Sequence, residues 1–110
     1  MHPATTTAAD VLHYWFDTLT PKDWWRKDEG IDRHIGDRFG DTLAAARRCE
    51  LYEWRETAHG RLAEIIVLDQ FSRHIHRDTA EAFAADAIAL ALAQEAVRIG
   101  ADEALAGAER

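Results

Sequence analysis

The sequence predicts an all-α domain that occupies the whole of residues 1–110. Apolar residues recur every three or four positions in several stretches, which is the spacing of one helix face. Helix breakers are scarce, with 6 glycines and 2 prolines, and no segment alternates polar and apolar residues as a strand does. The links between the expected helices are short, so we expect an antiparallel helical array or a short bundle of about four to five helices.

A first helix is expected over residues 7–19. Thr7 can accept a hydrogen bond from a free backbone amide, and Asp10 three residues later completes a capping box at the positive end of the helix. One face of this helix carries a continuous apolar stripe: Val11, Leu12, Trp15, Phe16 and Leu19. Pro21 prevents the helix from continuing and can open a further turn. Residues 1–6 are expected to be flexible.

A second helix is expected over residues 31–49, where the apolar positions fall on every fourth residue. These positions are Ile31, Ile35, Phe39 and Leu43. Gly36 and Gly40 interrupt the segment, and each costs about 1 kcal/mol relative to alanine in a helix interior. A bend near Gly40 is therefore the alternative to one continuous helix. Cys49, which has no second cysteine to pair with and no nucleophile motif around it, is expected to be an ordinary helix residue.

The last part of the chain is expected to form two further helices joined by a tight turn. The expected elements are a helix over residues 57–76, a helix over residues 79–99 and a short turn over residues 102–106. Asp78 or Thr79 can cap the second of these helices, and Gly100 can end it. The first of the two is apolar on nearly all sides in its first half, as is typical of the central helix of a domain.

The helix expected over residues 79–99 is rich in alanine and apolar on two opposite faces. One face carries Phe83, Ala87, Leu90 and Val97. The other carries Ile88, Leu92 and Ile99, which we take as the candidate interface. A helix that is apolar on two faces is usually sandwiched, either between helices of its own chain or against another protein.

A set of polar side chains interrupts the otherwise core-like helix over residues 57–76 and continues beyond it. The candidate cluster is Asp69, Gln70, Arg73, Arg77 and Asp86. Asp69 and Arg73 are four residues apart in the acid-before-base order that favours an ion pair, and Gln70 with His74 forms a second such couple. Burying these groups is costly unless each finds a partner, so the pattern predicts a specified network. Such a network either ties two helices together or forms a site for a ligand or partner.

Histidines and tryptophans are the remaining candidates for ligand-binding residues. Two couples have the three-residue spacing used in carboxylate-bridged di-iron bundles: Asp10 with His13, and Glu56 with His59. The four carboxylates that such a centre needs cannot be assembled here, while His74 and His76 point about 200° apart on a helix, so no metal site is predicted. The tryptophans can either anchor the core, which we expect, or line an aromatic ligand pocket. They are Trp15, Trp24, Trp25 and Trp54.

Charge and composition exclude several classes of function. The chain has 13 Lys and Arg against 20 Asp and Glu, and its formal net charge of -7 repels phosphate backbones and anionic lipids. Nucleic acid and membrane are therefore not expected as partners. No apolar run is long enough for a bilayer and residues 1–10 do not resemble a secretion signal, so a cytoplasmic location is expected. No cofactor is expected, because glycine-rich phosphate loops, nucleophile elbows and paired-cysteine motifs are absent.

Several stretches also carry a family resemblance. They are Tyr14, Trp15 and Phe16; Trp24 and Trp25; Ile31 and Asp32; Phe39; Trp54; Leu68, Asp69, Gln70, Phe71, Ser72 and Arg73; Arg77 and Asp78; and Ala82, Phe83, Ala84, Ala85 and Asp86. With these residues the chain resembles the bacterial family catalogued as domain of unknown function 924, over about residues 10–105. Two positions depart from the family pattern, since Ser72 and His74 stand where it usually has proline and asparagine.

The resemblance implies a tetratricopeptide-like array of antiparallel helices, and it implies no reaction. It also implies that relatives continue into further helices that carry a histidine-serine-glutamate motif. This chain is therefore expected to correspond to the amino-terminal half of the family, so that any family site in the second half would be incomplete here.

Two hypotheses of function follow. The first is a protein-interaction module that docks a protein partner, or a second copy of itself as a dimer, through the alanine-rich helix. The alternative is a small-molecule enzyme or binding protein in which Arg73 holds an anionic ligand and Asp69 orients it or acts as a base. A degenerate product without independent function is a third interpretation. The sequence leaves the choice open, and the most informative observation is whether Asp69 and Arg73 line a cleft or lie sealed between helices.

Overall fold

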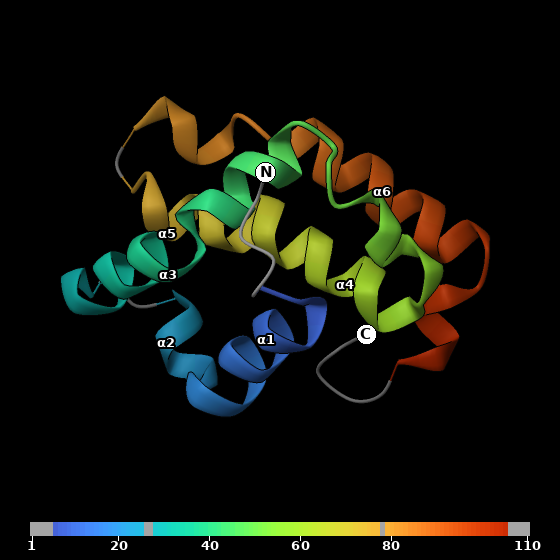
Figure 1. Cartoon of the computed structure of the whole chain (residues 1–110), viewed down its shortest axis with the longest axis horizontal. Coiled ribbons are helices and arrows are strands. Elements are labelled where there is room, and N and C mark those ends of the chain that lie inside the picture. Colours follow the sequence, from blue (N-terminus) through green and yellow to red (C-terminus); the bar gives the residue numbers. More distant parts are fainter. Residues whose placement is uncertain (1–5, 26–27, 78, 106–110) are drawn as a thin grey trace.

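The helices of this chain pack around one central run, α4–η3–α5. The computed structural model describes residues 6–25, 28–77 and 79–105; within these ranges every regular element is helical, and the predicted all-α class is confirmed. The elements are α1 (Ala8–Leu12), η1 (His13–Thr18), α2 (Pro21–Trp25), α3 (Glu29–Arg47), η2 (Tyr52–Glu56), α4 (Ala58–Ile66), η3 (Val67–Phe71), α5 (Ser72–Ile75), η4 (Ala80–Phe83), α6 (Asp86–Arg98) and η5 (Ala101–Ala104). Figure 1 shows α4 crossing the middle of the molecule, with α1 on one side and α6 on the other.

The first helix has the predicted start and extent, but its second half is wider than an α-helix. Thr7 Oγ1 accepts from the amide of Asp10 at 3.2 Å, and Asp10 Oδ2 accepts from the amide of Thr7 at 2.9 Å, so the predicted capping box is present. The turn η1 is π-helical: the amide of Leu19 donates to the carbonyl of Tyr14, five residues back, at 2.9 Å. After it, the predicted further turn is present as α2, which begins at Pro21.

The π-helical hydrogen bond of η1 changes the environment of Trp15. In an α-helix the carbonyl of Trp15 would accept from the amide of Leu19, but that amide is used by Tyr14. The indole N–H of Trp24 donates to the Trp15 carbonyl instead, at 2.8 Å. The wide turn is therefore joined directly to α2 by a side chain.

The second helix, α3, runs as one helix through Gly36 and Gly40, so the bend considered near Gly40 is not present. It begins slightly before the predicted position because Asp28 caps it, accepting from the amide of Ile31 at 3.1 Å. It ends before Cys49, which has a left-handed φ of 59°, and the prediction that Cys49 is a helix residue is wrong. The amide of Cys49 donates to the Ala46 carbonyl and the amide of Glu50 donates to the Ala45 carbonyl, which together form a Schellman motif.

The helix predicted over residues 57–76 is present as the continuous run α4–η3–α5. Thr57 caps it, accepting from the amide of Gly60 at 2.9 Å. In the middle of the run, η3 is a second π-helical turn, which was not predicted. An α-helix turns about 100° per residue and a π turn holds one residue more, so side chains after Phe71 are rotated relative to the phasing assumed from the sequence.

The helix predicted over residues 79–99 begins later than expected, and this prediction is corrected. A 3₁₀ turn (η4) comes first, and α6 begins only at Asp86. Thr79 does not cap α6, because its hydroxyl donates to the His76 carbonyl at 2.7 Å and so closes the preceding run; the other proposed cap, Asp78, lies outside the described residues. Ala82 and Ala85 are buried, with only 4% and 2% of each residue exposed. Packing of these small side chains therefore holds the segment before α6 in its turn.

The end of the chain follows the prediction more closely. Gly100 ends α6 with a left-handed φ of 77°, as glycine commonly does, and η5 follows it. The predicted turn over residues 102–106 therefore begins one residue earlier, and its last residue is not described. No described helix has the length and apolar character needed to span a membrane.

The core lies where the central run meets α1, η1 and α3. Its largest apolar side chains are aromatic: Tyr14, Trp15, Phe39 and Phe71. Their rings contact one another, with centroids 4.8 Å apart for Phe39 and Phe71 and 5.8 Å apart for Trp15 and Phe71. Both π-helical turns supply rings to this core, so the widened segments are packed on their inner side.

Candidate functional site

The polar cluster predicted from the sequence forms in part. Asp69 accepts from Arg73 Nη2 at 3.0 Å and from Gln70 Nε2 at 2.6 Å, so each carboxylate oxygen has its own donor. Arg73 also lies 3.5 Å from Asp86 Oδ1, across the turn that leads to α6, and its guanidinium lies 4.9 Å from the ring centroid of Phe83. The structure therefore brings together Asp69, Gln70, Arg73 and Asp86, four of the five predicted residues.

This cluster is neither sealed between helices nor fully open. The side chains of Asp69, Arg73 and Asp86 are 29%, 39% and 42% exposed. Ion pairs with this much access to water contribute at most about 1 kcal/mol to stability. Asp86 Oδ1 is itself buried and makes no hydrogen bond, since 3.5 Å to Arg73 gives an ion pair without good hydrogen-bond geometry. Stability alone is therefore a weak account of why these groups are there.

The fifth predicted residue, Arg77, belongs to a different cluster, and its assignment beside Asp69 and Asp86 is corrected. Its Nε and Nη2 donate to the two oxygens of Asp32 on α3, at 2.6 Å and 3.1 Å. His74 is 2% exposed and also contacts Asp32, with 2.7 Å between Nδ1 and Oδ1, so the predicted couple of Gln70 with His74 is wrong. His74 and Arg77 both lie where the end of the central run packs against α3, so their side chains reach a partner far away in the sequence.

The contacts of His74 indicate which of its ring nitrogens carries a hydrogen. Its Nδ1 lies 2.7 Å from a carboxylate oxygen of Asp32 and 3.1 Å from Arg77 Nη2. A carboxylate oxygen only accepts, and the contact with Asp32 is the shorter of the two, so it favours a hydrogen on Nδ1 that is donated to Asp32; Arg77, which only donates, then directs its hydrogens to Asp32. Burial raises the pKa of Asp32, but hydrogen bonds from Arg77 and then His74 outweigh it and lower the pKa below its ordinary value. The cluster Asp32–His74–Arg77 thus joins α3 to α5 as a charged clamp.

We predict that Asp32→Asn lowers the free energy of unfolding by about 1–2 kcal/mol near neutral pH, because hydrogen bonds to a charged group are lost. A carboxyl whose folded pKa is lowered stabilises the fold above its unfolded pKa, here near the ordinary value of 3.8, and loses this effect as the pH falls through the folded pKa. The difference between the two proteins should therefore shrink in acid. Urea denaturation over a pH series measures it, and a difference that does not depend on pH would contradict the prediction.

A pocket of about 220 Å³ lies beside Asp69, and Arg73 is not among its described lining residues. It is lined by Trp15, Phe16, Trp24, Leu62, Ile65, Ile66, Asp69 and Gln70. The rings of Trp15 and Trp24 are stacked, with centroids 5.4 Å apart and planes 7° apart, and Phe16 stands at 90° to Trp24 with a centroid distance of 5.7 Å. Both interpretations of the tryptophans therefore hold for this pair: Trp15 is buried in the core, and both rings also line a pocket.

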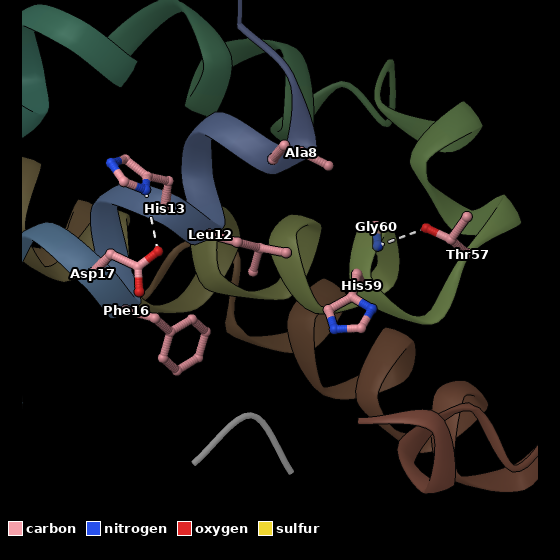
Figure 2. A pocket seen from close by; sticks show the side chains of 9 residues that line it. Ala8, Leu12, His13, Phe16, Asp17, Thr57, His59 and Gly60 are labelled. Carbon is pink, nitrogen blue, oxygen red and sulfur yellow. Dashed lines mark hydrogen bonds and ion pairs between the residues drawn. The ribbon is translucent and has the colours of Figure 1, made fainter. Parts of the chain in front are cut away.

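A second pocket, of about 490 Å³, lies between α1, η1 and the start of α4, and Figure 2 shows its lining. His13 pairs with Asp17 at 3.1 Å on one side, with both side chains about two-thirds exposed at 68% and 67%, and His59 lies on the other side. His13 thus pairs with Asp17, while Asp10 caps the helix. Among the described residues, no group of three or more metal-ligating side chains converges here or elsewhere.

A third pocket, of about 530 Å³, also borders the predicted cluster. Its described lining is Arg73, Arg77, Thr79, Ala80, Ala82 and Phe83. Both arginines are cationic, but each already contacts carboxylates: Arg73 contacts Asp69 and Asp86, and Arg77 contacts Asp32. Three carboxylates around two guanidinium groups leave this region without the excess positive charge that an anion site needs.

Sequence reasoning missed a buried ion pair at the start of the central run. Arg55 donates through Nε and Nη2 to both oxygens of Glu64, at 2.8 Å each, and the Glu64 side chain is only 1% exposed. The available signal was the position of Glu64 between Ala63 and Ile65, in a segment that is otherwise apolar. A carboxylate at such a position requires a cationic partner.

The face of α6 that was predicted as the candidate interface points mainly inward, and the other apolar face points outward. Ile88 and Leu92 are partly buried and pack against the core, and of the candidate set only Ile99 is exposed. The outward face carries Leu90 and Val97, which are 59% and 63% exposed. The reason is the small size of Ala85 and Ala89 on the inner side, which lets α6 approach the central run closely.

Comparison with known proteins adds the family. The chain matches the profile of a family described as "Bacterial protein of unknown function (DUF924)" over residues 11–110. It is similar, at 41% sequence identity and a TM-score of 0.87, to the solved structure of a protein of unknown function from Agrobacterium tumefaciens. That similarity covers 93% of this chain and 57% of the Agrobacterium chain, so this chain spans little more than half the length of that relative. No curated protein matches it. A profile match over nearly the whole sequence, together with this close structural likeness, shows that the chain belongs to the DUF924 family.

Proposed function

We propose that this chain is a protein-interaction module that docks a helical partner on the outward face of α6. One observation carries the proposal: Leu90 and Val97 are largely exposed and, being about two helical turns apart, lie one above the other. Ala87 and Ala91 on the same side are also exposed, and their small side chains let another helix approach closely. Large exposed apolar side chains that share one helix face are a feature of interaction sites.

The partner that suits this face is the further helical chain that the family resemblance implies. The match covers 57% of the Agrobacterium relative, so that relative has a further segment that could cover part of the shared fold. The inner side of α6 is occupied, because Ala89, Ile88 and Leu92 pack against the core. A helix laid on Leu90 and Val97 would make α6 an interior helix, which is where helices apolar on two faces are normally found.

The test uses the part of the Agrobacterium protein that this chain does not match, produced as a separate polypeptide. We expect it to bind this chain in sedimentation velocity and calorimetry. The double variant Leu90→Ser/Val97→Ser should lose binding and keep its circular dichroism spectrum, because both side chains are exposed. Tyr52→Ser removes a side chain that is 60% exposed on η2, an element other than α6, and should bind like the unmodified chain.

Two outcomes would overturn the proposal. One is a lack of binding by the unmodified chain to a probe that is itself folded. The other is a stable dimer of this chain alone that dissociates in the Leu90→Ser/Val97→Ser variant, which would mean that a second copy covers the face.

The small-molecule hypothesis has support from a different observation, the pocket beside Asp69 and Gln70. The charges around this pocket do not favour the anionic ligand of that hypothesis. Arg73, which was to hold the anion, is shared between Asp69 and Asp86 and does not line that pocket. An anion entering there would meet the Asp69 carboxylate before any described cation, so the same cavity suits a ligand of the opposite charge.

A further inference from the structure

The 220 Å³ pocket beside Asp69 has a negative and aromatic character that points to its own class of ligand, independently of the α6 surface. Among its described lining residues, Asp69 is the one ionisable group, and the other side chains are apolar or aromatic apart from the amide of Gln70. The pocket is smaller than the cavities that hold drug-sized molecules, which are about 300–1,000 Å³. It therefore suits a compact ligand, or the compact head of a larger one.

The polar end of the pocket offers hydrogen-bond acceptors. Asp69 is a carboxylate, and Gln70 uses its amide nitrogen on Asp69 at 2.6 Å, which leaves its carbonyl oxygen to accept. Arg73 does not fully neutralise Asp69, because its guanidinium also lies 3.5 Å from Asp86 and is shared between the two carboxylates. The three charged groups Asp69, Arg73 and Asp86 together carry a net charge of minus one. A ligand group placed there has to bring positive charge or hydrogen-bond donors.

The walls of the pocket are suited to a cation in a second way. Aromatic faces carry negative quadrupole density and attract ammonium groups within about 6 Å, tryptophan most strongly. Trp24 is stacked against Trp15 and fixed by its indole hydrogen bond to the Trp15 carbonyl, so its orientation is set before any ligand arrives. Phe16 stands perpendicular to it, and the two rings form an aromatic corner in the lining that also holds the acceptors.

The origin of these residues in the fold provides an independent indication. Trp15 and Phe16 come from η1, and Asp69 and Gln70 come from η3. Both are π-helical turns, which are rare in proteins and are found frequently at functional sites. The described chain thus brings its two π-helical turns to one small cavity, where each supplies two of the eight described lining residues and α2 and α4 supply the other four.

We propose that this pocket binds the ammonium head of a small organic cation. The aromatic corner of Phe16 and Trp24 contacts the alkyl or methyl groups around the nitrogen, and Asp69 neutralises the charge. The leucine and isoleucine side chains of α4 contact the apolar remainder of the ligand. A trimethylated nitrogen fits the aromatic walls, and the Gln70 carbonyl oxygen offers a hydrogen bond to an amine that retains a hydrogen.

The experiment compares choline with its neutral carbon isostere, in which a tert-butyl group replaces the trimethylammonium group. Tryptophan fluorescence is the readout, since two of the four tryptophans form the pocket wall. We expect choline to give a saturable change and to bind at least about tenfold more tightly than the isostere. Asp69→Asn, a change of similar shape at a partly exposed site, should weaken choline binding about tenfold.

The matched control is Asp86→Asn. It removes one of the two carboxylates that share Arg73 but keeps the Asp69 carboxylate in the pocket, so choline affinity should fall clearly less than in Asp69→Asn. Leu90→Ser/Val97→Ser should also leave choline binding unchanged, which separates this site from the α6 surface. The proposal is overturned by equal binding of choline and the isostere, by no saturable response to choline, or by an equal loss in Asp69→Asn and Asp86→Asn.

Discussion

Replacing Arg55 by methionine is expected to lower the free energy of unfolding by about 3–5 kcal/mol, the largest single effect that we predict for this chain. The substitution leaves the Glu64 carboxylate, whose side chain is 1% exposed, without the two hydrogen bonds of 2.8 Å that it accepts. Water cannot replace them at that position. The pairing is also visible from the arginine side, since the hydrogen bond with Glu64 is the main cause that raises the pKa of Arg55. Urea denaturation at neutral pH measures the loss.

The reverse deletion provides the control. Glu64→Met should cost clearly less than Arg55→Met, because the Arg55 side chain is 29% exposed and its guanidinium can turn to water. The double variant Arg55→Met/Glu64→Met should recover most of the loss, since an apolar pair of similar size needs no partner. Equal costs of the single substitutions that simply add in the double variant would show that the charge pairing is not the reason.

Gly60→Ala is expected to destabilise the fold by about 2–3 kcal/mol, although alanine normally stabilises a helix relative to glycine. A Cβ at this position would lie 1.9 Å from the carbonyl oxygen of Trp54 and 2.9 Å from Thr57 Oγ1. The first is backbone and cannot turn aside. The second is the capping oxygen that accepts from the amide of Gly60, so the clash also disturbs the start of α4.

Two other glycines serve as controls for this substitution. A Cβ at Gly36 or Gly40 would meet nothing within 4 Å, so alanine there should show its ordinary benefit of about 0.5–1 kcal/mol. Thermal unfolding of the three single variants separates the cases, because the sign of the change in unfolding temperature differs. Gly60→Ala with a stability equal to or above that of the unmodified chain would contradict the prediction.

The sequence indicates those parts of the fold that local interactions decide. The capping box of Thr7 and Asp10, the apolar spacing of α3 and the terminal position of Gly100 each involve residues a few positions apart. The start of α6 could not be predicted in this way. Every residue from Ala80 to Phe83 is compatible with a helix, and what keeps them out of α6 is packing of buried alanines together with a Thr79 hydroxyl directed at His76.

In the candidate site, too, contacts between residues close in the sequence could be predicted and contacts between distant residues could not. Asp69 with Arg73 is an i,i+4 pair and follows from helical spacing alone. The partner of His74 and Arg77 is Asp32, which is 42 and 45 positions away, and no local pattern indicates a contact at that distance. The aromatic and polar residues of the pocket were recognised in the sequence for other reasons: Trp15, Phe16, Trp24, Asp69 and Gln70. Their meeting depends on the extra residue in η1 and η3, and the apolar period gives no sign of it.

Ion pairs hold the chain on both sides of η3 and so keep that wide turn in its conformation. If η3 closed into an ordinary α-helical turn, the residues on one side would rotate by about 100° and shift by about 1.5 Å relative to the other. Glu64 holds the segment before the turn to Arg55, and His74 with Arg77 holds the segment after it to Asp32. Neither end is free to rotate, so the direction in which Asp69 and Gln70 point is set by ion pairs that lie outside their own pocket.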